Sequence, residues 1–148
     1  MKIVSKSAKE TQTAAAKLAK KILIKKRFAD HAVVIALSGN LGAGKTTFVQ
    51  GLAKALGIKR RVTSPTFILF RKHKLPKRRF YLYHFDLYRI RKIKELETIG
   101  FQKILTEPSN IVLIEWSEKV KRVLPRDTIW VELSYGRKET ERIIAYRR

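Results

Sequence analysis

One segment of the chain combines the residue types that bind a polyphosphate. Residues 39–46 read Gly-Asn-Leu-Gly-Ala-Gly-Lys-Thr, which satisfies the pattern G-x-x-x-x-G-K-[ST]. Glycines allow positive φ, so a bend of this kind turns consecutive main-chain N–H groups toward the phosphates. Lys45 supplies a positive charge for the β- and γ-phosphates, and Thr46 supplies a hydroxyl for Mg²⁺. We expect a nucleotide site formed by Asn40, Leu41, Gly42, Ala43, Gly44, Lys45, Thr46 and Thr47.

The sequence favours ATP over GTP at this site. The motif Asn-Lys-x-Asp, which recognises guanine, does not occur in the sequence. The expected ligands are therefore ATP and Mg²⁺.

Two carboxylates follow apolar segments of strand length. Asp86 comes after Tyr81–Phe85, and Glu115 comes after Ile111–Ile114. Sheets of the α/β class place their ligand chemistry at the carboxyl ends of strands. We expect Glu115 to hold Mg²⁺ together with Thr46, because its strand is more uniformly apolar, and Asp86 to orient the attacking water or to act in a switch. For each acid the alternative is a cap or turn residue without a ligand.

Three further side chains near these segments each have two interpretations. Thr66 follows a Ser-Pro dipeptide and either senses the γ-phosphate, as switch segments do, or simply begins a strand. Trp116 either stacks near the nucleotide or belongs to the core. His84 lies between two aromatic residues of a strand, which is more typical of a packed histidine than of a catalytic base.

Hydrophobic periodicity predicts the elements that position these residues. A capping box at Ser7–Glu10 opens a helix, Val33–Leu37 forms a buried strand, and a second helix runs from Lys45 to Leu56-Gly57. The later expected elements are a strand at Thr66–Phe70, a loop or hairpin connection at Arg71–Arg79, a strand at Phe80–Phe85, a short helix or turn at Lys94–Leu105, a strand at Ile111–Ile114 and a hairpin of Thr128–Leu133 with Arg142–Tyr146.

This order of elements predicts the fold class. Helices and strands interleave early and hairpins follow late, which indicates an α/β fold with a P-loop NTPase-like mixed β-sheet flanked by helices. The length of 148 residues fits a single domain over residues 1–148. Arg137 and Arg142 of the closing hairpin either approach the triphosphate or face solvent.

The charge of the chain is strongly positive and unevenly distributed. Lys and Arg number 34 against 12 Asp and Glu, for a net charge of +22. No acidic residue occurs between Asp30 and Asp86, an interval that holds eleven Lys and Arg. Such a field attracts polyanions such as tRNA, and the alternative is a solvated basic surface without a partner.

Composition also excludes several classes of protein. There is no cysteine, which excludes disulfides and thiolate chemistry. No stretch approaches the roughly 18 apolar residues of a membrane span, and no secretory signal is recognisable. We therefore expect a cytoplasmic protein without a membrane partner.

Several motifs, in this order and spacing, resemble the bacterial TsaE family. They are residues 39–48 (Gly-Asn-Leu-Gly-Ala-Gly-Lys-Thr-Thr-Phe), 64–67 (Ser-Pro-Thr-Phe), 83–89 (Tyr-His-Phe-Asp-Leu-Tyr-Arg), 95–97 (Glu-Leu-Glu) with Gly100, and 114–118 (Ile-Glu-Trp-Ser-Glu). The resemblance covers Ser5 to Tyr146. It implies an ATPase that works with TsaD and TsaB to install the threonylcarbamoyl group on the adenosine beside the anticodon of tRNA. TsaD carries out the transfer, and ATP hydrolysis by TsaE resets the complex.

The resemblance also implies roles for individual residues. Lys45 is the phosphate ligand, Thr46 and Glu115 are the magnesium ligands, and Asp86 is the acid needed for hydrolysis. Trp116 lies close to the nucleotide, and Thr11 matches a family position near the base. The chain departs from the family at Asn40, where an acid is usual, and in its large positive charge.

Two other functions remain open at the level of sequence. One is a small-molecule P-loop kinase that uses Arg71–Arg79 as a lid over phosphates, and phosphate transfer to a metabolite would favour it. The other is a basic RNA-binding module without catalysis, whose RNA affinity would not change with Lys45→Ala.

Overall fold

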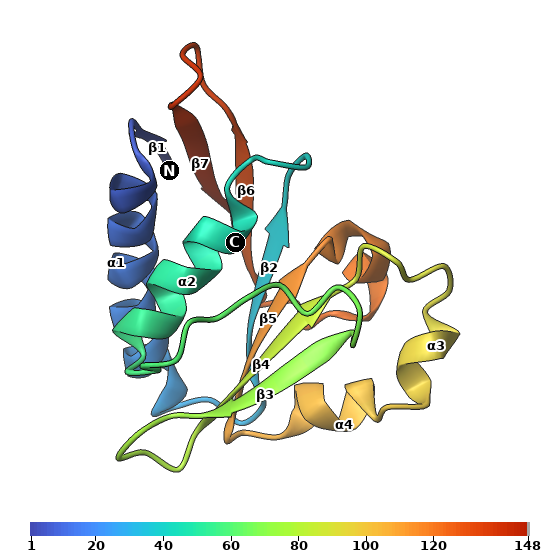
Figure 1. The fold of residues 1–148 in the computed structure, drawn as a ribbon. Coiled ribbons are helices and arrows are strands. Elements are labelled where there is room, and N and C mark those ends of the chain that lie inside the picture. Colours follow the sequence, from blue (N-terminus) through green and yellow to red (C-terminus); the bar gives the residue numbers. More distant parts are fainter. Residues whose placement is uncertain (148) are drawn as a thin grey trace.

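The computed structural model describes residues 1–147, and Arg148 lies outside the described residues. The elements are β1 Lys2–Ser5, α1 Ala8–Lys26, β2 Val33–Ser38, α2 Lys45–Ala55, β3 Phe70–Lys74, β4 Tyr81–Asp86, α3 Lys94–Glu97, α4 Phe101–Thr106, β5 Asn110–Glu115, the 3₁₀ helix η1 Ser117–Val123, β6 Ile129–Tyr135 and β7 Arg142–Arg147. They form the α/β architecture that the sequence predicts, with the helices arranged around one sheet (Figure 1).

The seven strands form one mixed sheet in the order β1-β7-β6-β2-β5-β4-β3. The strands β6, β2, β5 and β4 at its centre are parallel to one another. The strands β3, β7 and β1 join antiparallel at the two edges. The strand that leads into the glycine bend, β2, therefore lies between two parallel neighbours, and its residues are almost all buried.

Each face of the sheet has its own core cluster because side chains alternate along the strands. Val33, Ile35 and Leu37 of β2 belong to the cluster that α1 and α2 cover. Val34 belongs to the opposite cluster, which includes residues of α4 and η1. Figure 1 shows α1 and α2 at one side of the sheet and α3 and α4 at the other.

The strand register brings three carboxyl ends side by side. Glu115 of β5 pairs with Leu37 of β2 on one side and with Asp86 of β4 on the other. By alternation, Glu115 lies on the same face as Leu113, and that face is the one covered by α2. Both carboxylates consequently lie near the point where β2 enters the glycine bend.

Local signals explain how the two long helices begin. The Ser7 side chain accepts a hydrogen bond from the Glu10 amide at 3.2 Å, and the Glu10 carboxylate accepts one from the Lys6 amide at 2.7 Å. The Ser7 cap is as predicted, whereas the return bond of Glu10 goes to the amide of Lys6 and not to that of Ser7, as a strict capping box would have it. In contrast, α2 begins after Gly44 without a side-chain cap, which leaves its first N–H groups available to an anion.

The prediction for the segment before β4 was partly wrong. Residues 66–68 form a turn, in which the Ile68 amide donates to Pro65 O at 3.2 Å, and Leu69 has a φ of 72°. The strand β3 begins only at Phe70, so residues 71–74, expected in a loop or hairpin connection, continue it. Charged side chains on both faces hid this edge strand, because edge strands carry charges that discourage further pairing.

Two elements were not anticipated from the sequence. The short strand β1 pairs with β7 at the sheet edge, and η1 follows β5 directly. Among residues 1–147, no helix combines the length and the apolar character that crossing a bilayer requires.

Candidate functional site

The glycine bend between β2 and α2 has a backbone that only glycine adopts easily. Gly39 has a φ of 141° and Gly44 a φ of 98°. A Cβ atom on Gly39 would lie 2.2 Å from the carbonyl oxygen of Leu133, so even alanine would displace the neighbouring strand. The glycines therefore keep the bend open, and the bend leads into the N-terminus of α2.

Lys45 lies at the first turn of α2 and folds back over the bend. Its Nζ donates to the carbonyl oxygens of Gly39 at 2.5 Å and Asn40 at 3.0 Å. Burial lowers the pKa of Lys45, and the nearby carboxylates of Glu115, Glu118 and Asp86 partly oppose this effect. The amine is thus a nearly buried donor, held by carbonyl oxygens and surrounded by negative charge.

Glu115 is held by a histidine from the neighbouring strand. His84 Nε2 lies 2.9 Å from Glu115 Oε1, and the two side chains are 0% and 3% exposed. Because a carboxylate only accepts hydrogen bonds, this contact places a proton on Nε2. The sequence interpretation of His84 as a packed histidine is right about its burial but misses this contact.

Asp86 stabilises the turn that precedes β3 through hydrogen bonds. Its Oδ2 accepts hydrogen bonds from the hydroxyls of Ser64 and Thr66, the latter at 2.7 Å, and its Oδ1 accepts one from the Tyr88 amide at 3.0 Å. Both oxygens of the carboxylate are therefore engaged. A hydrogen bond thus links Thr66 to Asp86. The interpretation of residues 64–68 as a switch segment requires a link of this kind to a carboxylate of the site.

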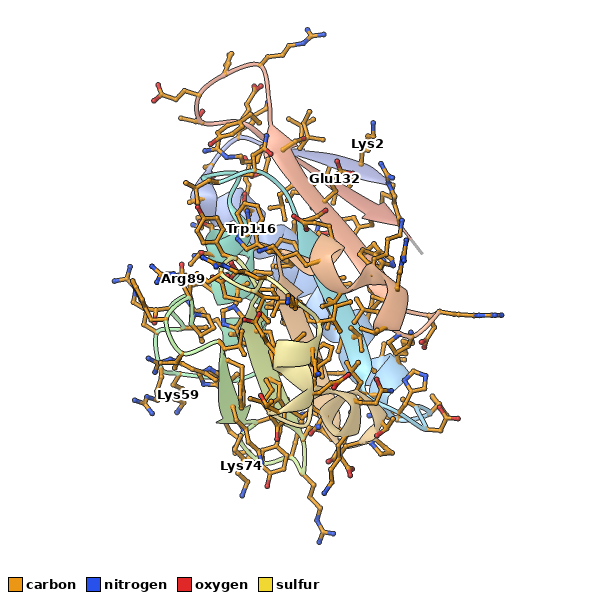
Figure 2. The ribbon with its side chains drawn as sticks, turned by 90° about the vertical axis from the view of Figure 1, so that its right-hand side faces the viewer. Lys2, Lys59, Lys74, Arg89, Trp116 and Glu132 are labelled. Atoms are coloured by element: carbon orange, nitrogen blue, oxygen red, sulfur yellow. The ribbon has the colours of Figure 1, made fainter. Side chains whose placement is uncertain are left out.

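Trp116 lies directly beside Lys45. The Lys45 Nζ is 4.2 Å from the centroid of the Trp116 ring, and the ring centroids of Trp116 and Tyr88 are 5.0 Å apart. Trp116 has a φ of 58°, and the next residue, Ser117, donates from its hydroxyl to Leu37 O at 2.8 Å. The tryptophan is half-buried. Figure 2 shows where it lies relative to the other labelled side chains.

The β6–β7 hairpin closes the other side of the bend. The Tyr135 hydroxyl donates to Leu41 O at 2.7 Å, and the Arg142 guanidinium lies 4.7 Å from the Tyr135 ring. The Arg142 side chain also runs past Gly44, where an added Cβ would lie 3.7 Å from its Cγ. Arg142 therefore borders the bend, whereas Arg137 lies in the exposed loop of the hairpin.

The remaining expected residues divide into two groups. Ala43 is buried beneath the bend, Asn40 and Leu41 are exposed, and Thr46 and Thr47 are half-buried at the start of α2. Thr11 is 2% exposed, and its hydroxyl is paired with that of Ser5 at 2.7 Å, at the end of β1; its place near the base stays a prediction.

The structure thus brings most of the expected side chains to one place and adds some that sequence reasoning missed. Lys45, Glu115 and Asp86 converge at the carboxyl ends of adjacent strands. His84 was detectable in principle, because its two-residue offset from Asp86 places both side chains on the same face of β4. Tyr135 carried no comparable signal, since its contact with the bend depends on tertiary packing.

Comparison with known proteins decides the family. The model of the family "Threonylcarbamoyl adenosine biosynthesis protein TsaE" matches residues 5–144. The chain belongs to the TsaE family. The match includes the bend, both carboxylates, β6 and the first residues of β7.

Individual relatives agree with this assignment. A TsaE protein of Treponema pallidum is 37% identical over 133 residues, which is 90% of each chain. One from Haemophilus influenzae is 38% identical over 76% of this chain and 70% of its own, and one from Rickettsia prowazekii is 42% identical over 68% and 67%. The relatives are named as tRNA threonylcarbamoyladenosine biosynthesis proteins.

A solved structure shows the same fold. The crystal structure of YdiB from Bacillus subtilis superposes with a TM-score of 0.72 at 29% identity, covering 99% of this chain and 83% of that one. This TsaE-family chain therefore shares its architecture over nearly its whole length with that protein.

Proposed function

We propose that this chain is a magnesium-dependent ATPase of the cytoplasm. In this proposal it supports threonylcarbamoyladenosine formation on tRNA together with TsaD and TsaB, and ATP hydrolysis resets the complex. One observation carries the proposal. A lysine in the glycine bend faces carboxylates from the ends of two adjacent strands, which is how phosphate and metal ligands are arranged in P-loop ATPases.

The residues present fit a triphosphate. Positions 39, 42 and 44 of the bend are glycines, so no Cβ atom occupies the space beside the backbone there. The N-terminus of α2 has no side-chain cap and offers main-chain N–H groups to a phosphate. The Lys45 amine currently donates to two carbonyl oxygens of the bend. Phosphate oxygens are stronger acceptors, so we expect the amine to turn toward them when the nucleotide binds.

The residues also fit Mg²⁺ as a shared ligand of protein and nucleotide. Thr46 and Glu115 would contribute two oxygens. Residues 1–147 contain no group of three or more His, Cys, Asp or Glu side chains that would hold a metal by themselves. Mg²⁺ commonly takes one or two protein oxygens and completes its shell with phosphates and water. When bound, the ion would neutralise charge on the β- and γ-phosphates.

The surroundings of Asp86 suggest slow hydrolysis by the isolated chain. Its two oxygens accept three hydrogen bonds, from Ser64, Thr66 and the Tyr88 amide, so about one acceptor site is left for a water molecule. A partner that moves residues 64–68 would free the carboxylate. We therefore propose that TsaD and TsaB accelerate hydrolysis by acting on this turn.

The test combines nucleotide binding with complex formation. We expect the chain to bind Mg-ATP in calorimetry, to hydrolyse it slowly alone, and to hydrolyse it faster with TsaD and TsaB. It should also co-purify with them when ATP is present. Lys45→Ala should remove the ATP-dependent part of each result. Unchanged nucleotide affinity in Lys45→Ala would refute the proposal.

The kinase alternative loses its main structural argument. It required Arg71–Arg79 to move as a lid, but residues 71–74 are fixed in β3 by pairing with β4. Turnover without phosphate transfer to an added metabolite would favour the ATPase.

A further inference from the structure

The edge of the sheet at β3 carries a dense group of exposed cations, which we call the basic edge. They come from the end of α2 and the loop after it, from β3, and from the β3–β4 turn. The members are Lys54, Lys59, Arg60, Arg61, Arg71, Lys72, Lys74, Lys77, Arg78 and Arg79, and all ten are exposed. Figure 2 shows Lys59, Lys74 and Arg89 along the same side of the molecule.

Packing holds the three stretches of the basic edge together. Leu56 and Ile58 after α2, Val62, and Leu75 at the end of β3 share one buried core cluster. A Cβ on Gly57 would lie 3.5 Å from Pro76 in the β3–β4 turn. The cations are therefore fixed on adjoining elements and do not belong to independent flexible loops.

A hollow of about 590 Å³ opens within the basic edge. It is lined by Gln12 and Gln50 as well as by Lys54 and residues 57–62. Amide side chains and guanidinium groups are donors that suit phosphate oxygens. The hollow thus gives the basic edge a concave place that is rich in hydrogen-bond donors.

Among residues 1–147, no ion pair with a carboxylate neutralises a cation of the basic edge. In the described part of the chain, the ion pairs of Lys and Arg with carboxylates involve Lys25 with Asp127 and Arg147 with Glu132, both outside the basic edge. Lys72 lies over aromatic rings instead, 4.2 Å from the centroid of Tyr81. The pKa of His73 is lowered by burial first and then by His84, Arg71 and Arg60, which shows a local positive field.

The side chains of this surface match a nucleic acid better than a bilayer. Insertion into a membrane requires exposed apolar groups beside the cations. Residues 54–62 and 70–83 of the described structure carry no exposed large hydrophobic side chain, and the nearest ones, Phe67 and Ile68, lie in the turn before β3, outside the stretches that carry the cations. Binding of a phosphate backbone requires only fixed cations and hydrogen-bond donors, and aromatic rings offer the bases a surface for stacking.

We propose that the basic edge is a binding surface for the phosphate backbone of RNA. The surface acts through charge and is expected to read shape more than sequence. The choice of tRNA as its ligand rests on the proposed function, whereas the surface itself does not depend on it. Bound there, tRNA would contact a face formed by β3 and the end of α2, while the nucleotide site keeps its own ligands.

The experiment compares two variants that remove the same charge from different places. The edge variant carries Arg60→Gln, Arg61→Gln, Lys72→Gln and Lys74→Gln. The control variant carries Lys2→Gln, Lys121→Gln, Arg122→Gln and Arg126→Gln, at exposed positions of β1, of η1 and after η1, none of which lines the hollow. Filter binding measures affinity for an unmodified tRNA transcript between roughly 50 and 300 mM salt, a range over which such contacts weaken strongly.

The edge variant should lose about 10-fold or more in affinity near physiological salt, and its log-log salt slope should become shallower by about 3. The control variant should change by about 3-fold at most. Equal losses in both variants would mean that net charge alone binds RNA, and no loss in the edge variant would remove the site; either result overturns the proposal. Stronger edge-dependent binding to phosphatidylserine vesicles than to tRNA would also overturn it, in favour of a membrane.

A parallel measurement separates this inference from the proposed function. Mg-ATP affinity should be unchanged in the edge variant, because none of its four positions contacts the glycine bend. Unchanged tRNA affinity in the edge variant, with intact ATP binding, would refute the basic edge alone. Absent ATP binding in the unmodified chain would refute the proposed function alone.

Discussion

Lys45 and Lys26 are both nearly buried, with exposures of 6% and 3%, and they lie at opposite ends of the parallel strands. Each donates to main-chain carbonyl oxygens, and burial is the main cause that lowers the pKa of each. Lys26 is the last residue of α1 and bonds to Asn110 O at the start of β5. Lys45 lies where β2 and β5 end.

The surroundings of the two lysines differ in what they offer a ligand. Lys26 lies 5.6 Å from the Phe80 ring centroid, and the one carboxylate that raises its pKa is that of Glu107. Lys45 has a glycine bend, an uncapped helix and three carboxylates around it. A buried lysine is therefore no indication of function by itself. The convergence of main-chain donors with carboxylates from adjacent strands is what distinguishes a site.

The largest expected effect separates the two lysines directly. Lys45→Ala should weaken Mg-ATP binding about 1000-fold, because charge-assisted hydrogen bonds to two phosphates are lost at about 1.5–3 kcal/mol each. Lys26→Met should leave nucleotide affinity within about 2-fold. Calorimetry on both variants makes the comparison, and similar losses in both would contradict it.

The carboxylates beside the two lysines give the next contrast. Glu115→Gln keeps the shape of the side chain but removes its charge, so the magnesium concentration needed for tight nucleotide binding should rise about 100-fold. Glu107→Gln, beside Lys26, is the matched control and should not change the magnesium titration. An unaltered titration in Glu115→Gln would show that this carboxylate is not a metal ligand.

The hydrogen bond from His84 to Glu115 should contribute a smaller effect. His84→Ala should raise the required magnesium concentration about 10-fold, since groups that orient metal ligands contribute on this scale. His84→Asn, whose side-chain amide keeps a donor, should restore part of the affinity. Equal effects of both substitutions, tracking only a lower melting temperature, would indicate that His84 contributes packing alone.

The smallest effect concerns Lys26 and pH. Its pKa is about 8 in the folded chain against 10.5 for an ordinary lysine, so above pH 8 the unfolded state binds more protons. The free energy of unfolding should therefore rise with pH, by about 1 kcal/mol between pH 7 and 9, relative to Lys26→Met. Denaturant titrations at several pH values measure this difference. A difference that falls with pH would contradict the burial of a charged Lys26.

The elements that could be predicted from the sequence are those whose signals lie within a few neighbouring residues. The helix cap at Ser7, the apolar run of β2 and the glycine bend each act over a few residues, and the structure confirms them as elements. The strand β3 was misplaced because its alternation is masked by basic side chains on both faces. The strand β1 depends on its pairing with β7, which lies at the other end of the chain.

The site was predictable to a similar extent. The sequence identified Asp86 and Glu115 by their position after apolar strands, and the register places them side by side. It did not reveal that Asp86 holds the hydroxyls of Ser64 and Thr66, because such contacts follow from the course of a loop.

The most direct test of this account is a crystal structure of the chain with Mg²⁺ and a non-hydrolysable ATP analogue. We predict the triphosphate within hydrogen-bond distance of main-chain N–H groups of residues 40–46, with Lys45 Nζ on the β- and γ-phosphates and the metal between Thr46 and Glu115. An analogue bound elsewhere, with Lys45 still donating to Gly39 and Asn40, would contradict this prediction.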